Sequence, residues 1–484
     1  MWNGVSPVSK KNFYIRKPMK LKYSEFEIPE NEPYKNDLLN RGEFGENLTK
    51  IVSQITNPLT ISVNGSWGTG KTVFLKMWNQ SLKDAGYSTV YFSAWEDDYC
   101  DDALLALIGQ IWKNIKDNDW EEMGKTFKEV ATSLLKNISS QFLVNAIRIC
   151  TANTVELDIE ALKSHLESNV EKMLDEYVAA TSGIKSVKEK LKEFSEKHQK
   201  KTGNPLVIII DELDRCRPLF AIELLEKIKH FFEIPHIIFV FGIDREQLEH
   251  SIRSVYGNID ADEYLRRFID LEFLLKMSDR EPFFKSIFEK YGFVNHLVVP
   301  AVNSNWSATV SKCFSLSLRE MEYLARTLVV GSIIVPGAGR YILPLLIALK
   351  MRDEIFYKRI IGGECNATEI IDRLTKTHNA WELFGIDPAT KRYVRGHGHA
   401  LCAELYAISP RSWRDGVIEA LRESNGKPSQ LSETLFHAAV QEVFYMTQDG
   451  TRHFDTNFDL AIHQGIPIND ISKCIELVGF KDEA

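Results

Sequence analysis

The sequence predicts an α/β fold in which a parallel sheet is interrupted by a helical insertion and followed by a mainly helical C-terminal part. Short apolar runs with β character alternate with amphipathic helical patterns from about residue 61 to 275, which is typical of crossover units in a parallel sheet. A glycine-rich turn separates the first run from the helix that follows it. After residue 275 the β signals fade and helical patterns dominate.

The first elements are predicted in chain order from the periodicity of their apolar residues. Residues 43–55 have helical spacing, and the first strand ends at Val63. The amphipathic segment 72–86 forms the helix after the glycine-rich turn and stops at its terminal glycine. Residues 88–95 alternate and are rich in β-forming residues, so they form the second strand.

The middle of the chain is predicted to leave the sheet and return to it. Residues 102 to about 201 are almost entirely helical in pattern, and we interpret their many charges as solvated helical faces rather than a partner-binding coiled coil. Residues 206–211 and 236–243 are continuous apolar runs with the character of buried parallel strands, and a helical pattern lies between them. Residues 271–275 give the last β signal.

These patterns divide the chain into four parts. We expect an N-terminal arm (1–33), an α/β core (34–275) that contains the helical insertion (about 102–201), a helical lid (276–375), and a helical C-terminal region without an assigned role (376–484).

Composition and charge are those of an ordinary globular chain, with 44% apolar and 26% charged residues. The formal net charge of −8 argues against a generic nucleic-acid binder, although local basic patches stay open. Seven cysteines without CxxC spacing indicate reduced thiols and a cytoplasmic location. Residues 328–349 could span a bilayer by length, but Arg340 and a Pro-Gly break favour two buried helices, so we expect no integral membrane segment.

The glycine-rich turn matches the pattern G-x-x-x-x-G-K-[ST] of a phosphate-binding P-loop. Glycines let successive backbone N–H groups surround an anion, and the following helix directs its positive end at the phosphates. Lys71 can reach the β- and γ-phosphates, and Thr72 offers a hydroxyl to Mg²⁺. The residues expected to bind the nucleotide here are Gly65, Ser66, Trp67, Gly68, Thr69, Gly70, Lys71, Thr72 and Val73.

A Mg²⁺-nucleotide site also needs a carboxylate at the end of a neighbouring strand. Asp211 ends an apolar run and fits this role, either directly or through a metal-bound water. Glu212 is a natural base to orient or deprotonate an attacking water, and Asp214 competes for that role. The structural alternatives are a helix-capping or ion-pairing role for Glu212 and a pairing of Asp214 with Arg215.

Asp244 ends the next buried run, where a polar side chain would lie beside the γ-phosphate and could sense it. A plain turn role is the alternative. The chain has no NKxD sequence, the usual guanine-reading motif, so ATP is favoured over GTP by default.

Four stretches carry a more specific pattern than the glycine turn alone. They are NDLLNRGEFGENLTKIV, NGSWGTGKTVFLKMW, YFSAWEDDYCDDALLALI, and VIIIDELDRCRP followed by FVFGIDREQLEHSI. These stretches resemble the KAP family of P-loop NTPases, well over residues 34–275 and weakly to about 375. The resemblance implies an additional-strand, AAA+-like α/β ATPase core with a helical lid. The family often has Asp-Asp where this chain has Asp211-Glu212, and the membrane helices of many eukaryotic members do not carry over.

The resemblance also assigns roles to four arginines. Arg41 would lie near the nucleotide. Arg266 and Arg267 lie in YLRRFID, which resembles the arginine-bearing segment of AAA+ ATPases, so they could enter a neighbouring subunit's site and offset γ-phosphate charge. The alternative is a surface helix with solvated arginines. Arg319 opens a lid helix and is a candidate sensor in cis.

Two classes of function follow. The first is an ATP-binding and ATP-hydrolysing switch that uses Mg²⁺, and the second is a catalytically weak, ATP-dependent scaffold that assembles partner proteins. A small-molecule kinase is a third reading, for which no acceptor pocket is identified. Bacterial family members are associated with exclusion of phages and often work beside separately encoded effectors. The resemblance therefore implies the ATPase component of a multi-protein phage-defence system, acting as a homo-oligomer or with effector proteins.

Overall fold

The structure is a computed structural model of the chain. It describes residues 26–55, 57–99, 191–277, 279–291, 303–334, 341–378 and 380–384, and single positions between 103 and 111, at 188 and 189, between 401 and 409, and at 475. The chain forms two compact units, one made of Glu27–Asp37 and Arg41–Lys276, the other of Met277–Ala484 with Met1–Phe26 and Leu38–Asn40.

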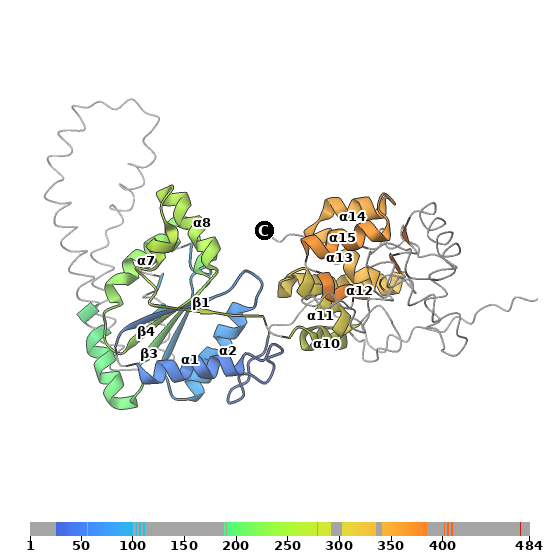
Figure 1. The fold of residues 1–484 in the computed structure, drawn as a ribbon. Coiled ribbons are helices and arrows are strands. Elements are labelled where there is room, and N and C mark those ends of the chain that lie inside the picture. The colour runs from blue at the N-terminus through green and yellow to red at the C-terminus, as the bar shows by residue number, and fades with distance from the viewer. Residues whose placement is uncertain are drawn as a thin grey trace, which may run out of the picture. The chain divides into compact units, whose positions relative to one another are not determined.

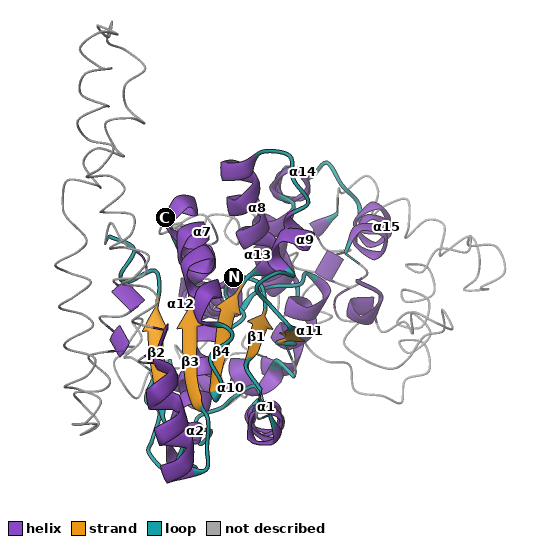
Figure 2. Cartoon of the chain, turned by 90° about the vertical axis from the view of Figure 1, so that its left-hand side faces the viewer, coloured by secondary structure: helices purple, strands orange, loops and turns teal. Residues whose placement is uncertain are grey.

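The first unit is built on a five-stranded parallel sheet (Figure 2). Its strands are β1 (Leu59–Asn64), β2 (Thr89–Ser93), β3 (Leu206–Asp211), β4 (Ile237–Ile243) and β5 (Leu271–Leu274). They lie in the order β2-β3-β4-β1-β5. The predicted parallel sheet is confirmed, and every strand expected from the sequence is present.

β4 lies between the strand that precedes the P-loop and the strand that ends in Asp211. Asn64 at the end of β1 is in register with Ile243, and Asp211 is in register with Gly242. The sheet therefore has the additional strand that the family resemblance implies. The sequence interpretation placed Asp211 on a neighbouring strand, which is wrong in this detail, because β3 is separated from β1 by β4.

Two pairs of helices cover the two faces of the sheet (Figure 1). They are α1 (Gly42–Gln54) and α2 (Lys71–Asp84) on one face, and α7 (Pro218–Ile228) and α8 (Arg245–Tyr256) on the other. The short helix α9 (Ala261–Leu265) precedes β5. Alternate residues of β3 belong to the hydrophobic cores on the two faces of the sheet. Val207 and Ile209 pack with α1 and α2, while Ile208 and Ile210 pack with α7 and α8.

Local signals set several helix ends. α2 stops before Gly86, which has the left-handed φ of 81° that a helix C-terminus favours. α7 begins with Pro218, whose missing N–H is harmless in the first turn. The carboxylate of Asp244 caps α8 by accepting from the Gln247 N–H.

The described elements of the second unit are helical, as the sequence predicts. They are α10 (Glu281–Lys290), α11 (Ser304–Cys313), α12 (Leu318–Ile334), α13 (Ile342–Arg352), α14 (Glu354–Ile361), α15 (Ala367–Thr377) and the 3-10 helix η3 (Ala380–Phe384). All residues from Ile342 to Leu349 are buried in their common core.

The apolar stretch 328–349 therefore belongs to two helices, α12 and α13, as expected, and their junction at Pro336-Gly337 lies outside the described residues. Within the described part of the chain, no helix combines the length and apolar character needed to cross a bilayer. The expected N-terminal arm up to residue 25, most of the insertion 102–201 and most of the region 376–484 also lie outside the described residues.

Candidate nucleotide-binding site

The turn between β1 and α2 needs its glycines for backbone conformation. Gly68 and Gly70 have φ values of 75° and 83°, in the left-handed region that other residues seldom adopt. Gly65 has an ordinary φ, but a Cβ there would lie 3.0 Å from the hydroxyl of Thr69. That hydroxyl donates to the Ser66 carbonyl at 2.7 Å, so the turn is closed by its own side chain. Contacts within the chain therefore stabilise this conformation of the loop.

The N-terminus of α2 offers N–H groups to an anion. Gly70 is the N-cap and gives no side-chain cap, and the first helical bond runs from the Phe74 N–H to the Gly70 carbonyl. The N–H groups of Lys71, Thr72 and Val73 therefore have no acceptor within the helix. Partial positive charge at this helix end favours a phosphate there.

Lys71 lies beside the loop carbonyls and close to acids. It is 8% exposed, and its ammonium donates to the Gly65 carbonyl. Burial lowers the pKa of Lys71, while the negative charges of Asp214, Asp244 and Asp211 oppose this change. The lysine is thus a charged group that the protein holds at the loop with three acids near it.

Arg41 contacts the backbone of the loop, and its expected place near the nucleotide stays a prediction. Its guanidinium donates to the carbonyls of Thr69 at 2.6 Å and Gly70 at 3.2 Å. Burial lowers the pKa of Arg41 to about 10, with the Asp37 carboxylate opposing this change. The buried Nε has no hydrogen-bond partner in the structure.

Asp211 is fully buried at the carboxyl end of β3. Its Oδ2 accepts from the Tyr91 hydroxyl at 2.7 Å, and its Oδ1 accepts from the Glu212 N–H at 2.9 Å. Burial raises the pKa of Asp211 to about 6, and the bond from Tyr91 opposes this rise. A cation beside this carboxylate would favour its ionised form despite the burial. The ionised form is the one that binds Mg²⁺.

Glu212 follows in the left-handed conformation, with φ 62° and ψ 25°. Its carboxylate accepts from the Ser93 hydroxyl at 3.0 Å and from the Thr72 hydroxyl at 3.4 Å. It also pairs with the Arg215 guanidinium at 2.8 Å. The ion-pairing role that the sequence left open for Glu212 is therefore observed, next to the P-loop threonine.

Asp214 does not pair with Arg215, contrary to the structural alternative from the sequence, because Arg215 turns toward Glu212. Asp214 is buried, and its Oδ2 instead accepts from the Trp67 indole at 2.5 Å. Its Oδ1 is buried without a hydrogen-bond partner. Asp214 thus anchors the P-loop through Trp67, and a role as catalytic base stays a prediction.

Asp244 anchors the same loop from β4. Its Oδ2 accepts from the Trp67 backbone N–H at 2.9 Å, and its other oxygen caps α8. Both oxygens of Asp244 are therefore used by backbone groups, which gives the turn role a structural basis. A second role in sensing the γ-phosphate stays a prediction.

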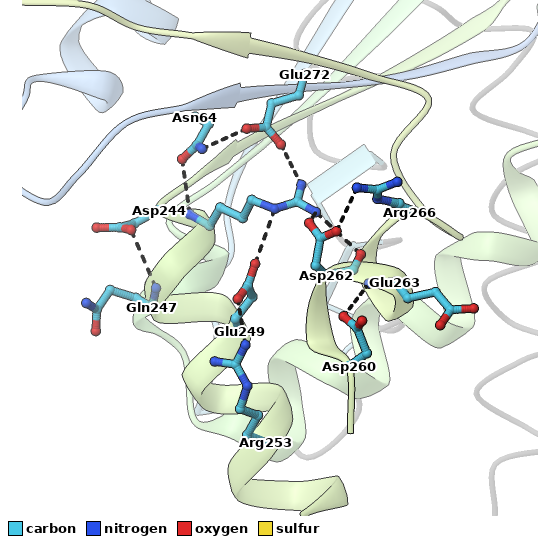
Figure 3. A network of polar contacts seen from close by, with 11 residues as sticks. Asn64, Asp244, Gln247, Glu249, Arg253, Asp260, Asp262, Glu263, Arg266 and Glu272 are labelled. Atoms are coloured by element: carbon cyan, nitrogen blue, oxygen red, sulfur yellow. Dashed lines mark hydrogen bonds and ion pairs between the residues drawn. The ribbon is translucent and has the colours of Figure 1, made fainter. Parts of the chain in front are cut away.

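A network of charges joins the start of the P-loop to the α9 segment (Figure 3). Arg245 pairs with Glu272 and Asp262, each at 2.5 Å, and with Glu249 at 3.3 Å. Its backbone N–H donates to the side chain of Asn64, which directly precedes the loop. The sequence analysis did not select Arg245, because nothing in its motif context marks it.

The two arginines of YLRRFID are exposed at the C-terminal end of α9. Arg266 pairs with Asp262 one helical turn earlier at 2.8 Å, and its side chain is 74% exposed. Arg267 is also exposed. The third candidate, Arg319, is exposed in the first turn of α12 in the second unit. Their proposed roles stay predictions.

The sequence analysis missed the hydroxyl groups of β2, Tyr91 and Ser93. They alternate along one strand and reach the acids of the next, since Ser93 is in register with Asp211. The alternation of these residues was visible in the sequence. Only the pairing of β2 with β3 shows that their hydroxyls lie beside Asp211 and Glu212. Arg215 and the Trp67 indole are further partners of the acids that the motifs did not reveal.

The site fits Mg²⁺ held together with a nucleotide. Among the described residues no group of three His, Cys, Asp or Glu side chains could hold a metal ion by itself. Mg²⁺ at nucleotide sites is usually held by one or two carboxylates together with substrate phosphates. Asp211 and Thr72 are the residues here that suit this arrangement, and the glycine cradle of the P-loop suits the phosphates.

Residues 41–332 match the model of the KAP family P-loop domain, which is more than half of the chain. The chain belongs to this family. The family is one of P-loop NTPases, so the KAP match supports nucleotide binding and hydrolysis at the loop described above.

Other comparisons add little to the KAP assignment. The search of curated proteins found no significant match. Among solved structures, the ORC2 protein of Aeropyrum pernix is 12% identical, with 94% of this chain and 97% of that chain covered and a TM-score of 0.31. A DNA replication initiation factor is 13% identical, with 90% and 93% covered and a TM-score of 0.24. Scores this low do not establish a shared fold.

Proposed function

We propose that the chain is an ATP-binding and ATP-hydrolysing switch. The observation that carries the proposal is that two pairs of residues meet at the carboxyl ends of the strands. Lys71 and Thr72 come from the P-loop, Asp211 ends β3, and Glu212 directly follows it. The hydroxyl of Thr72 lies 3.4 Å from the Glu212 carboxylate, and the charge of Asp211 acts on Lys71. ATP remains the nucleotide favoured by the absence of a guanine-reading NKxD sequence.

The residues of the site divide the work of binding and hydrolysis. Lys71 and the free N–H groups of α2 neutralise and orient the phosphates. Asp211 and Thr72 would hold Mg²⁺, which would offset the negative charge of the phosphates. Trp67 links the loop to Asp214 and Asp244, which keeps the loop in place through the cycle.

Glu212 orients the attacking water and accepts its proton. A carboxylate has about four lone-pair positions, and the contacts to Ser93, Thr72 and Arg215 occupy three of them. Acceptor capacity therefore remains for a water. The same carboxylate lies beside the hydroxyl of Thr72, so a water bound to it would lie near the P-loop.

The ion pair between Glu212 and Arg215 favours a second candidate function. If the pair persisted in the nucleotide complex, the positive charge would weaken Glu212 as a base. The chain would then be a catalytically weak scaffold that assembles partner proteins when it binds ATP.

Phosphate release and Mg-ATP affinity, measured on the full chain, separate these functions. Glu212→Gln keeps the size of the side chain and should lower phosphate release by roughly 10²- to 10⁴-fold, with affinity within about twofold of wild type. Lys71→Ala should weaken Mg-ATP binding by roughly 10- to 100-fold, because it removes charged hydrogen bonds to phosphate. Arg319→Ala, measured beside them, should lower release if that arginine is a sensor.

Glu223→Gln is the matched control, because Glu223 is a half-buried glutamate of α7 that pairs with Lys227 and has no contact with the site among the described interactions. It should match wild type in both measurements. Equal, background-level release by wild type and Glu212→Gln, with normal ATP binding, would leave only the scaffold. Absence of Mg-ATP binding by wild type would remove both functions.

We further propose that the switch works in the cytoplasm as the ATPase component of a phage-defence system, with the helical region 276–375 as its lid and with other copies or effector proteins as partners. Membership of the KAP family is the support for this part. In a bacterium that carries the complete gene neighbourhood, Lys71→Ala should restore phage plating to the level of a deletion strain. Equal protection by wild type and Lys71→Ala would contradict the defence role of the ATP site.

A further inference from the structure

Tyr91 brings a hydroxyl to the acid that the proposed function assigns to Mg²⁺. β2 is the edge strand beside β3, and Tyr91 is in register with Ile209. The Tyr91 hydroxyl donates to Oδ2 of Asp211 at 2.7 Å. A tyrosine hydroxyl keeps its proton at neutral pH, so it acts as the donor in this bond.

The surroundings of Asp211 leave its carboxylate one orientation. Its second oxygen accepts from the Glu212 N–H at 2.9 Å. On the other side lies Gly242 of β4, where a Cβ would come within 2.5 Å of Oδ1. Thr72 is a further hydrogen-bond partner of Asp211. Rotation of the carboxylate would break the bond from Tyr91, so Tyr91 is one of the groups that fix the angle of the acid.

We propose that Tyr91 is a positioning residue that sets the orientation of Asp211 for Mg²⁺. The inference rests on the proposed function, because it presumes that Asp211 holds the ion. Groups that hydrogen-bond a metal-binding carboxylate fix its direction, and their loss typically costs 10- to 100-fold in metal affinity. The contact with Asp211 is local to the acid, so Tyr91 affects the metal rather than the phosphates, which the P-loop binds.

The chain offers a matched control in Tyr87. Tyr87 and Tyr91 pack against the same core of α1, α2 and the sheet. The Tyr87 hydroxyl interacts with Ser53 instead of an acid of the site. Tyr87→Phe and Tyr91→Phe therefore remove the same group from two tyrosines of one core, and only one of these changes touches Asp211.

The experiment measures ATP binding by the full chain in EDTA and across a Mg²⁺ titration. For Tyr91→Phe we expect the Mg²⁺ concentration at half-saturation to rise about 10-fold or more, with the affinity for ATP in EDTA within twofold of wild type. Tyr87→Phe should match wild type in both. Tyr91→His keeps an aromatic ring and an N–H donor, should give a smaller shift, and serves if Tyr91→Phe fails to show a cooperative unfolding transition.

Two outcomes overturn the inference alone. One is an unchanged Mg²⁺ requirement in Tyr91→Phe, and the other is an equal loss of ATP affinity with and without Mg²⁺, which would mean that Tyr91 only supports the fold. A different result in the wild-type protein would overturn the proposed function, and this inference with it. That result is either no binding of ATP, or binding of ATP that is equally strong with and without Mg²⁺.

Discussion

The candidate site has a buried part and an exposed part, and the two differ in how their charges are held. Lys71, Asp211 and Asp214 are each less than 10% exposed. Arg266, the first candidate for a group that acts on another subunit, is 74% exposed in its side chain and makes one surface ion pair, with Asp262. The neighbouring Arg267 is exposed as well.

The difference follows from the cost of burying charge. A buried charge is unfavourable unless it is paired or hydrogen-bonded, so each acid and the lysine of the buried part have partners within the chain. An exposed arginine has no such requirement, and a surface ion pair contributes only about 0–1 kcal/mol. The charges of the buried part therefore find their partners within one chain. The exposed arginines can exchange a surface ion pair for a contact with another subunit at little cost.

Of the changes considered, a methyl group at Gly242 should destabilise the buried part of the site most. A Cβ at this position would lie 2.3 Å from Leu75 and 2.5 Å from Asp211. We expect Gly242→Ala to lower the free energy of unfolding by about 1–3 kcal/mol, because overpacking forces the neighbours to shift. Urea denaturation of the full chain measures this loss.

Gly42→Ala is the control for this prediction, since a Cβ at Gly42 meets only ordinary contacts at 3.5 Å and beyond. Alanine is also the better helix former, so this variant should be as stable as wild type or slightly more stable. Equal stability of Gly242→Ala and wild type would show that the strand can move away from Asp211 at little cost.

Arg245 connects the buried and exposed parts, so its loss should have an intermediate effect. Its side chain is 17% exposed and pairs with Asp262 and Glu272. Arg245→Gln leaves these carboxylates close together without the central cation, and we expect a loss of about 1–2 kcal/mol, between the values for surface and buried pairs. Salt should reduce the loss, because screening weakens the repulsion among the remaining acids.

Arg253→Gln provides the comparison, because Arg253 is 42% exposed and pairs with Glu249 on the same helix. Its expected cost is below about 0.5 kcal/mol. Urea denaturation at low and high sodium chloride concentration measures both variants. If they lost equal stability at low salt, the Arg245 network would be an ordinary set of surface pairs.

The strands and the P-loop were predictable from the sequence because their signals are local. Apolar runs and, for β2, alternation of β-forming residues predicted the five strands, and Gly68 and Gly70 stand where the turn needs left-handed φ. The family resemblance implied that the sheet has an additional strand in its order, which no local signal reveals. It also led us to Arg41, whose contacts with the loop carbonyls fit a place near the nucleotide.

The partners of the acids were not predictable, because they depend on contacts between distant parts of the chain. Tyr91 is 120 residues from Asp211, and the Trp67 indole is 147 residues from Asp214. Such pairs require the strand order and register, which apolar periodicity does not specify. For the same reason, the structural alternative for Asp214 was a pairing with its neighbour Arg215, although that arginine reaches Glu212.

Substitution of the exposed arginines should have the smallest effect on stability, and it tests directly whether the chain assembles with other copies. Arg266→Ala together with Arg267→Ala should change the free energy of unfolding by less than about 0.5 kcal/mol and leave Mg-ATP affinity unchanged. If the arginines act on a neighbouring subunit, ATP turnover per wild-type chain rises with protein concentration, and the double variant loses that rise.

Arg253→Ala removes an exposed arginine of α8 and should keep the concentration dependence. Turnover measured over a range of protein concentrations, with particle mass measured in parallel, decides between these outcomes. The same rise in the double variant as in wild type would identify Arg266 and Arg267 as solvated surface residues. The exposure of these arginines would then have no bearing on catalysis, and all catalytic groups would belong to the buried part of the site.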